Sequence, residues 1–174
     1  MRDTPVYLYF SVLITVAIVC LAGCGENDDE TTNQNDDPPG MTPVEEACLH
    51  AREDHPLTRQ ATADRDDASA NIAETHTHFR IELPENEDEE FAGYVVYDVD
   101  RDAEYGLFAS ADIPLSFLDG EGEALEAQSE AVDECPEITT LHSVQLEAGE
   151  YFVHFGPSAH DEISTVTERL TESH

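Results

Sequence analysis

The chain has 174 residues, of which 40 are acidic and seven basic, and its formal net charge at pH 7 is −33. All seven basic residues are arginine, and lysine and tryptophan do not occur. A surface this acidic repels nucleic acid and anionic lipid headgroups, which makes both poor direct partners, and we expect no nucleic acid as a partner. Two explanations of the charge stay open: a saline habitat in which salt screens the repulsion, and the binding of divalent cations.

The N-terminal stretch predicts an export signal. An apolar run over residues 6–20 follows Arg2 and is shorter than the roughly 20 residues of a membrane-spanning helix. It ends in Leu21-Ala22-Gly23-Cys24, which has the form of a lipobox. We therefore expect a signal peptide over 1–23 and lipidation of Cys24, with an ordinary export signal and a chance cysteine as the alternative.

This N-terminus resembles that of bacterial lipoproteins. The resemblance implies a thioether-linked diacylglycerol on Cys24 and an amide-linked acyl chain, such as palmitate, on its amino group. Two or more acyl chains hold a protein stably on a membrane without a spanning helix. Gly25 stands where many inner-membrane lipoproteins have Asp, so the expected location is the cell envelope, anchored in the outer membrane.

The segment after Cys24 has the composition of a linker. Residues 25–40 contain no large apolar side chain and cannot bury a core. We therefore expect residues 24–41 to form a disordered, acidic tether. The tether would carry a folded domain over 42–169, followed by a frayed tail over 170–174.

Two of the four cysteines remain for a structural role. Cys20 leaves with the signal and Cys24 is lipidated, so Cys48 and Cys135 are the pair left in an oxidising compartment. A disulfide between them would remove about 4–5 kcal/mol of denatured-state entropy in the chain model. Two buried thiols are the alternative.

The first predicted element of the domain is a short helix. Thr42 suits the N-cap, Pro43 the first helical position, and Glu45 completes a capping box. Pro56 is expected to end the helix. The following residues recur at i, i+3, i+4 and i+7, which places Cys48 on a buried face: Val44, Ala47, Cys48 and Ala51.

From Leu57 on, short alternating runs separated by acidic and Gly/Pro turns predict strands. The main runs lie at 77–83, 91–99, 104–109, 113–117, 124–128, 138–146, 150–155 and 163–168. Asp100-Arg101-Asp102 and Glu147-Ala148-Gly149 are each expected to form the turn of a hairpin. Eight or nine short strands in a chain of this length predict an all-β fold, an antiparallel, jelly-roll-like β-sandwich with one N-terminal helix.

The domain resembles small exported lipoproteins of myxobacteria and their relatives over roughly residues 44–168. The final predicted hairpin is also similar to the jelly-roll domains appended to secreted peptidases. The resemblance implies a lipid-anchored β-sandwich without assigning its function. It rests on these motifs: Ala47-Cys48-Leu49-His50, His78-Phe79-Arg80, Ala103-Glu104-Tyr105, Glu134-Cys135, Leu146-Glu147-Ala148-Gly149-Glu150-Tyr151 and Phe155-Gly156-Pro157.

Histidine is the residue type that most suggests a site. His76 and His78 lie two apart on a predicted strand, so both imidazoles are expected to face the same way. Such a pair can chelate Zn²⁺ or Cu²⁺ with a third ligand from elsewhere, for which His50 and His142 are the candidates. The alternatives are a solvated His-x-His pair and, for His142, a core histidine in phase with its apolar neighbours.

A second metal pattern is acidic. Asp98, Asp100, Asp102 and Glu104 alternate like the start of a calcium loop, but the glycine and the bidentate Glu of an EF-hand are missing. A weak Ca²⁺ contact and simple turn chemistry both stay open. The acidic run over 85–90 is expected to be solvated surface.

The chain lacks the Gly-x-Ser-x-Gly and His-Glu-x-x-His motifs, a phosphate-binding glycine loop and a free nucleophilic cysteine. We therefore expect a lipid-anchored extracytoplasmic protein that is not an enzyme, has no cofactor, and acts in binding or envelope organisation. A metal-binding envelope lipoprotein, using Zn²⁺, Cu²⁺ or weakly bound Ca²⁺, is the alternative.

Overall fold

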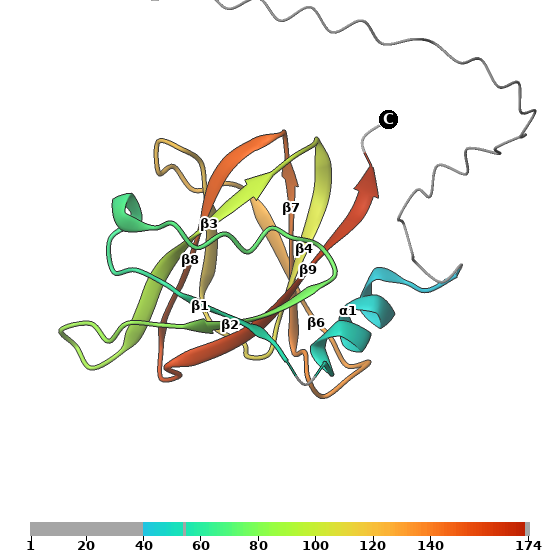
Figure 1. The fold of residues 1–174 in the computed structure, drawn as a ribbon, viewed down its shortest axis with the longest axis horizontal. Coiled ribbons are helices and arrows are strands. Elements are labelled where there is room, and N and C mark those ends of the chain that lie inside the picture. The colour runs from blue at the N-terminus through green and yellow to red at the C-terminus, as the bar shows by residue number, and fades with distance from the viewer. Residues whose placement is uncertain (1–39, 54, 173–174) are drawn as a thin grey trace, which may run out of the picture. The chain divides into compact units, whose positions relative to one another are not determined.

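Two β-sheets and one α-helix account for the regular structure of residues 40–53 and 55–172, the part of the chain described by a computed structural model. One sheet has six strands in the order β1-β2-β9-β4-β7-β6, and the other has three in the order β3-β8-β5 (Figure 1). The predicted signal peptide, Cys24 and nearly all of the tether lie outside the described residues.

The elements follow one another closely along the chain. The helix is α1 (Pro43–Ala51), and a 3₁₀ turn, η1 (Arg65–Asp67), follows the first strand. The strands are β1 (Leu57–Gln60), β2 (Thr77–Glu82), β3 (Phe91–Val99), β4 (Ala103–Ala109), β5 (Leu115–Leu118), β6 (Ala127–Ala131), β7 (Thr140–Leu146), β8 (Gly149–Ser158) and β9 (Glu162–Glu172).

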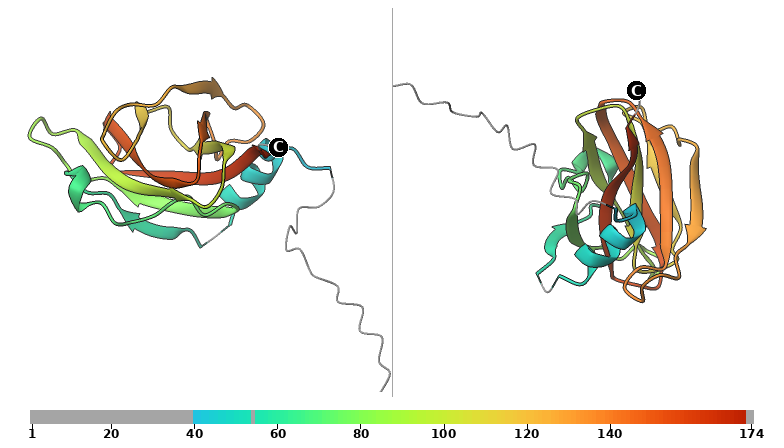
Figure 2. Two further views of the ribbon diagram at one scale, coloured as in Figure 1. Left: turned by 90° about the horizontal axis from the view of Figure 1, so that it is seen from above. Right: turned by 90° about the vertical axis from the view of Figure 1, so that its right-hand side faces the viewer.

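The two sheets face each other and enclose the main core (Figure 2). Phe79 and Leu107 of the six-stranded sheet and Tyr97 and Phe155 of the three-stranded sheet are completely buried there. All strand pairs are antiparallel except β1 with β2, which is parallel. The predicted all-β sandwich is therefore confirmed.

Helix α1 begins as the sequence predicts. Thr42 Oγ1 accepts a hydrogen bond from the Glu45 amide at 3.2 Å, and Glu45 Oε2 accepts one from the Thr42 amide at 2.8 Å. The Glu45 carboxylate accepts hydrogen bonds from the Thr42 amide and, at 3.1 Å, from the Thr42 hydroxyl, and these two bonds lower the pKa of its side chain. The helix ends at Ala51, one turn earlier than Pro56 requires.

A second, smaller core lies on the outer face of the six-stranded sheet, under α1. Ala47 and Cys48 of the helix pack with Phe108, Leu141 and Val166 of the sheet. An isolated helix of this length is unstable in water, so its position depends on these contacts. The helix is thereby held on a defined area of the sheet, beside β9.

The predicted disulfide between Cys48 and Cys135 is present, with the two Cα atoms 6.0 Å apart. Cys135 lies in the connection between β6 and β7, which the disulfide joins to α1. Both residues are almost completely buried in the second core.

The two predicted hairpins are wrong. β3 pairs with β8 and β4 pairs with β7, so each of the two short turns passes from one sheet to the other. The turns lie side by side, and Asp102 Oδ1 accepts a hydrogen bond from the Ala148 amide at 2.8 Å. Turn residues specify a reversal of the chain, but they do not specify which sheet the next strand joins.

Some boundaries also differ from expectation. β9 continues through Glu172, beyond the expected end of the domain at Arg169, because Leu170 packs against the second core. β6 begins three residues later than predicted. Within residues 40–53 and 55–172, no helix has the length and apolar character needed to cross a membrane.

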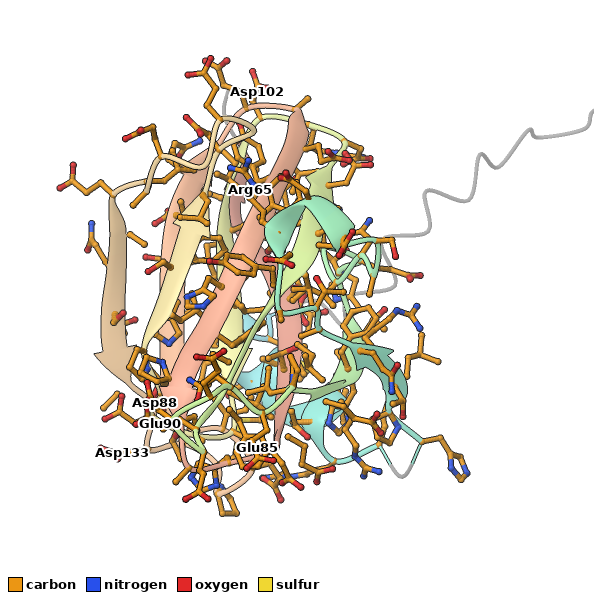
Figure 3. All side chains as sticks on the ribbon, turned by 90° about the vertical axis from the view of Figure 1, so that its left-hand side faces the viewer. Arg65, Glu85, Asp88, Glu90, Asp102 and Asp133 are labelled. Atoms are coloured by element: carbon orange, nitrogen blue, oxygen red, sulfur yellow. A yellow bond between two sulfur atoms is a disulfide. The ribbon has the colours of Figure 1, made fainter. Side chains whose placement is uncertain are left out.

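Acidic side chains occupy turns at both ends of the sandwich. Glu85, Asp88 and Glu90 lie at one end and Asp102 at the other (Figure 3). Residues 85–90 are all exposed, as expected for a solvated acidic loop. Asn86 Oδ1 accepts hydrogen bonds from the amides of Asp88 at 2.9 Å and Glu90 at 3.0 Å, so this loop is a closed turn.

Candidate metal centre

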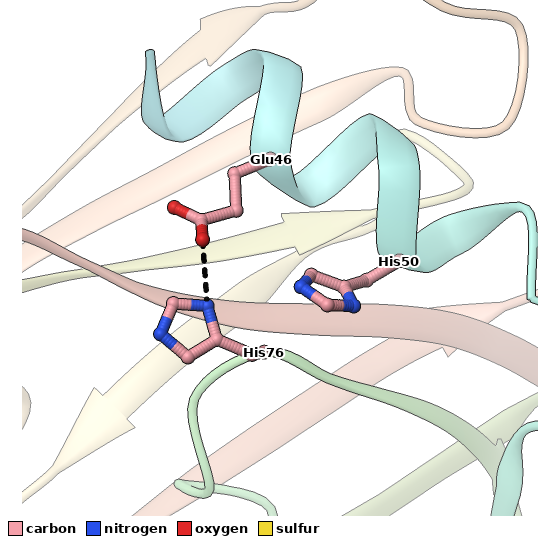
Figure 4. Close-up of side chains that lie close together, drawn as sticks. All are labelled: Glu46, His50 and His76. Carbon is pink, nitrogen blue, oxygen red and sulfur yellow. Dashed lines mark ion pairs between the residues drawn. The ribbon is translucent and has the colours of Figure 1, made fainter. Parts of the chain in front are cut away.

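Three side chains with metal-ligating atoms meet at the edge of α1 (Figure 4). Glu46 and His50 come from the helix, and His76 comes from the turn that precedes β2. One potential ligand atom from each lies within 4.8 Å of the other two. The rings of His50 and His76 have centroids 5.5 Å apart and are tilted by 50°.

The helical repeat explains why Glu46 and His50 act together. Residues four apart lie one above the other on the same side of a helix. Glu46 and His50 are each two residues away from Cys48. At roughly 100° per residue, each therefore lies about 160° around the helix from Cys48, on the other side. The disulfide therefore holds one side of α1, while the other side presents the two potential ligands.

The backbone places His76 in an unusual conformation. Its φ angle is 59°, in the left-handed region that residues other than glycine seldom adopt. The His76 amide donates a hydrogen bond to the Thr167 carbonyl oxygen at 3.0 Å, which ties this turn to β9. A residue held in this region is often found at a functional site.

A second carboxylate, that of Glu168 on β9, also lies next to His76. Its Nδ1 lies 3.0 Å from Glu46 Oε1 and 2.9 Å from Glu168 Oε2 of β9. The Glu168 side chain is 1% exposed, the Glu46 side chain 14% and the His76 side chain 38%. The site therefore extends from a buried carboxylate to an imidazole that solvent reaches.

His50 is also oriented by a carboxylate. Its Nδ1 lies 2.9 Å from Glu53 Oε1. A metal-binding histidine commonly donates its second ring N–H to a carboxylate, which fixes the ring and its tautomer. In this arrangement Nε2 is the nitrogen that His50 offers to an ion.

The structure brings together two of the four predicted histidines. His78 does not join the group because β2 begins only at Thr77, so the expected i, i+2 alternation does not extend back to His76. His78 is buried instead on β2, opposite Val166 of β9. Burial lowers the pKa of His78, and the nearby Glu53 opposes this effect.

His142 lies on the opposite face of the six-stranded sheet, facing the main core. It is opposite Leu107 in the register of β7 and β4, and its Nδ1 is 2.7 Å from Ser129 Oγ of β6. Burial lowers its pKa, with an opposing effect from Asp112. His142 is therefore a core histidine, which was the alternative interpretation of this residue. It cannot bind the same metal ion as His50.

The acidic run from Asp98 to Glu104 has other roles. Asp100 pairs with Arg101 at 3.2 Å, and Asp102 bonds the neighbouring turn. Asp98 and Asp100 line a pocket of 260 Å³ that also contains Arg169. No three carboxylates of this run form a metal-ligand group among the described residues.

Sequence reasoning missed both glutamates of the site. Glu46 lies one turn before His50, a spacing that could have marked it as a partner. Glu168 alternates in phase with Val166 and Leu170, a signal that it faces the covered side of its strand. Its meeting with His76 depends on the pairing of β2 with β9, which no local pattern predicts.

Neither the protein-family models nor the curated proteins give a match to this chain. The chemistry of the donor set is therefore the guide to its ligand. Imidazole suits Zn²⁺, Cu²⁺ and Ni²⁺, whereas Mg²⁺ and Ca²⁺ prefer oxygen ligands alone. Two imidazoles with a carboxylate are typical of zinc sites.

Proposed function

We propose that this chain is an exported, lipid-anchored protein that binds a divalent transition metal ion through Glu46, His50 and His76. The observation that carries the proposal is the convergence of their ligand atoms within 4.8 Å. The Glu53 carboxylate beside His50 Nδ1 and the left-handed backbone of His76 support it, because both hold the donors in place.

The charge of the protein is consistent with this role. A net charge of −33 raises the local concentration of cations around the domain. The lipobox at Leu21-Ala22-Gly23-Cys24 supports a location on the envelope, where the domain would bind ions outside the cytoplasm. We propose binding rather than turnover, because the sequence contains no catalytic motif.

The test is a metal titration of the full chain purified in detergent. Zn²⁺ and Cu²⁺ are added in separate titrations, with excess Mg²⁺ present to saturate weak, non-specific binding to surface carboxylates. Binding is followed by calorimetry and elemental analysis. We expect one tightly bound transition metal ion per chain. Sub-stoichiometric metal that does not increase on adding Zn²⁺ or Cu²⁺ would refute the proposal.

A further inference from the structure

We infer that Glu168 is a fourth ligand of this ion, so that the protein alone completes its coordination shell. This inference rests on the proposed metal binding and concerns how the same site works. The ion would be held by two imidazoles from His50 and His76 and by two carboxylates from Glu46 and Glu168.

The spacing of the donor atoms supports this set. Bonds of about 2.0–2.1 Å to Zn²⁺ put neighbouring ligand atoms of a tetrahedral site roughly 3.3 Å apart. His76 Nδ1 is already 3.0 Å from Glu46 Oε1 and 2.9 Å from Glu168 Oε2. His76 Nδ1 therefore has one oxygen of each carboxylate beside it, and His50 offers a further ligand atom within 4.8 Å of those of Glu46 and His76.

The charges point the same way. Both carboxylates approach the same nitrogen, His76 Nδ1, which carries at most one proton. A buried carboxylate is costly unless it is paired with a positive charge. A divalent ion in place of that proton carries two positive charges, which neutralise the two carboxylates. The two imidazoles bind it as neutral ligands.

A four-ligand shell has a consequence for function. Catalytic zinc sites keep one position open for water, whereas structural sites are closed by protein ligands. Glu46 and His50 lie on α1, Glu168 lies on β9 and His76 is tied to β9. A closed site would therefore lock the helix to the sheet and retain the ion, without presenting a metal-bound water for hydrolysis.

The test uses the full chain loaded with Co²⁺, whose visible absorption reports coordination number. The variant is Glu168→Gln, with Glu130→Gln, which removes an exposed carboxylate of β6, as the matched control. We expect an intense four-coordinate spectrum for the unmodified chain that azide does not change. Glu168→Gln should bind Co²⁺ and Zn²⁺ at least about tenfold more weakly, and azide should alter its spectrum.

Two results would overturn the inference while leaving the proposed function intact: an azide-sensitive spectrum of the unmodified chain, or full affinity in Glu168→Gln. If Glu168→Gln does not fold, the azide titration of the unmodified Co²⁺ form still decides between four protein ligands and three with an exchangeable water. A chain that binds no Co²⁺ or Zn²⁺ contradicts the proposed function itself.

Discussion

His76 Nδ1 lies 2.9 Å from Oε2 of Glu168, a carboxylate that is 1% exposed. This contact joins a partly exposed turn to a buried carboxylate of β9, the strand on which α1 packs. The proposed site is therefore part of the fold and not an attachment to its surface. The proposed ligands come from the helix, the turn before β2 and strand β9, so substitutions in any of the three should alter metal affinity.

The first prediction separates the site histidines from the others. His50→Ala and His76→Ala should each abolish tight Zn²⁺ binding, because each removes one of three or four ligands. His142→Ala should lower stability yet retain Zn²⁺ affinity, since His142 faces the main core. Calorimetric titration measures the affinities, and His160→Ala, which removes an exposed imidazole, is the control.

The second prediction concerns the disulfide. Cys48→Ala combined with Cys135→Ala should lower the free energy of unfolding by about 2–5 kcal/mol. Zn²⁺ affinity should fall as well, because the disulfide helps to hold the helix that carries Glu46 and His50. Urea unfolding and Zn²⁺ titration measure the two effects.

A non-reducing gel provides the control for the disulfide. Oxidised and reduced forms of the unmodified chain should migrate differently, and Cys48→Ala should abolish the difference. Unchanged Zn²⁺ affinity in the double variant would show that the second core alone positions the ligands.

The third prediction is a loss of stability in mild acid, apart from any effect of metal. Burial lowers the pKa of His142 and of His154 below the ordinary value of 6.5. Below that pH the unfolded chain therefore binds more protons than the folded one, so the free energy of unfolding falls as the pH falls. The loss of free energy of unfolding caused by these two histidines is complete once the pH is below their pKa values in the folded chain.

Urea unfolding of the metal-free chain at about pH 8 and about pH 5.5 measures this effect. His142→Gln should reduce the difference between the two pH values, because the variant has no imidazole to protonate at that position. An equal difference in the variant and the unmodified chain would rule out a contribution from His142.

The fourth prediction tests the anchor. Cys24→Ala should move the protein from the membrane fraction to the aqueous fraction, because the lipid chains have no attachment point. Mass spectrometry of the unmodified protein should find acyl groups on Cys24. A membrane-bound Cys24→Ala variant would contradict the predicted lipid anchor.

The sequence by itself predicted the local features of the fold. Alternating side chains marked most of the strands, and the capping box marked the start of α1. The two cysteines left over after the predicted signal peptide and lipobox marked the disulfide. Each of these depends on neighbouring residues or on simple counting. For that reason they did not require knowledge of which strands pair.

The tertiary structure decided which residues meet. The turns at Asp102 and Ala148 cross between the sheets instead of closing hairpins, and this placed β3 with β8 and β4 with β7. The pairing of β2 with β9 put Glu168 beside His76, and the packing of α1 on β9 added Glu46 and His50. His142 lies on the other face of the same sheet, because each step along a strand reverses the direction of its side chains. Contacts between distant segments depend on strand order and helix docking, and both of these are properties of the whole core.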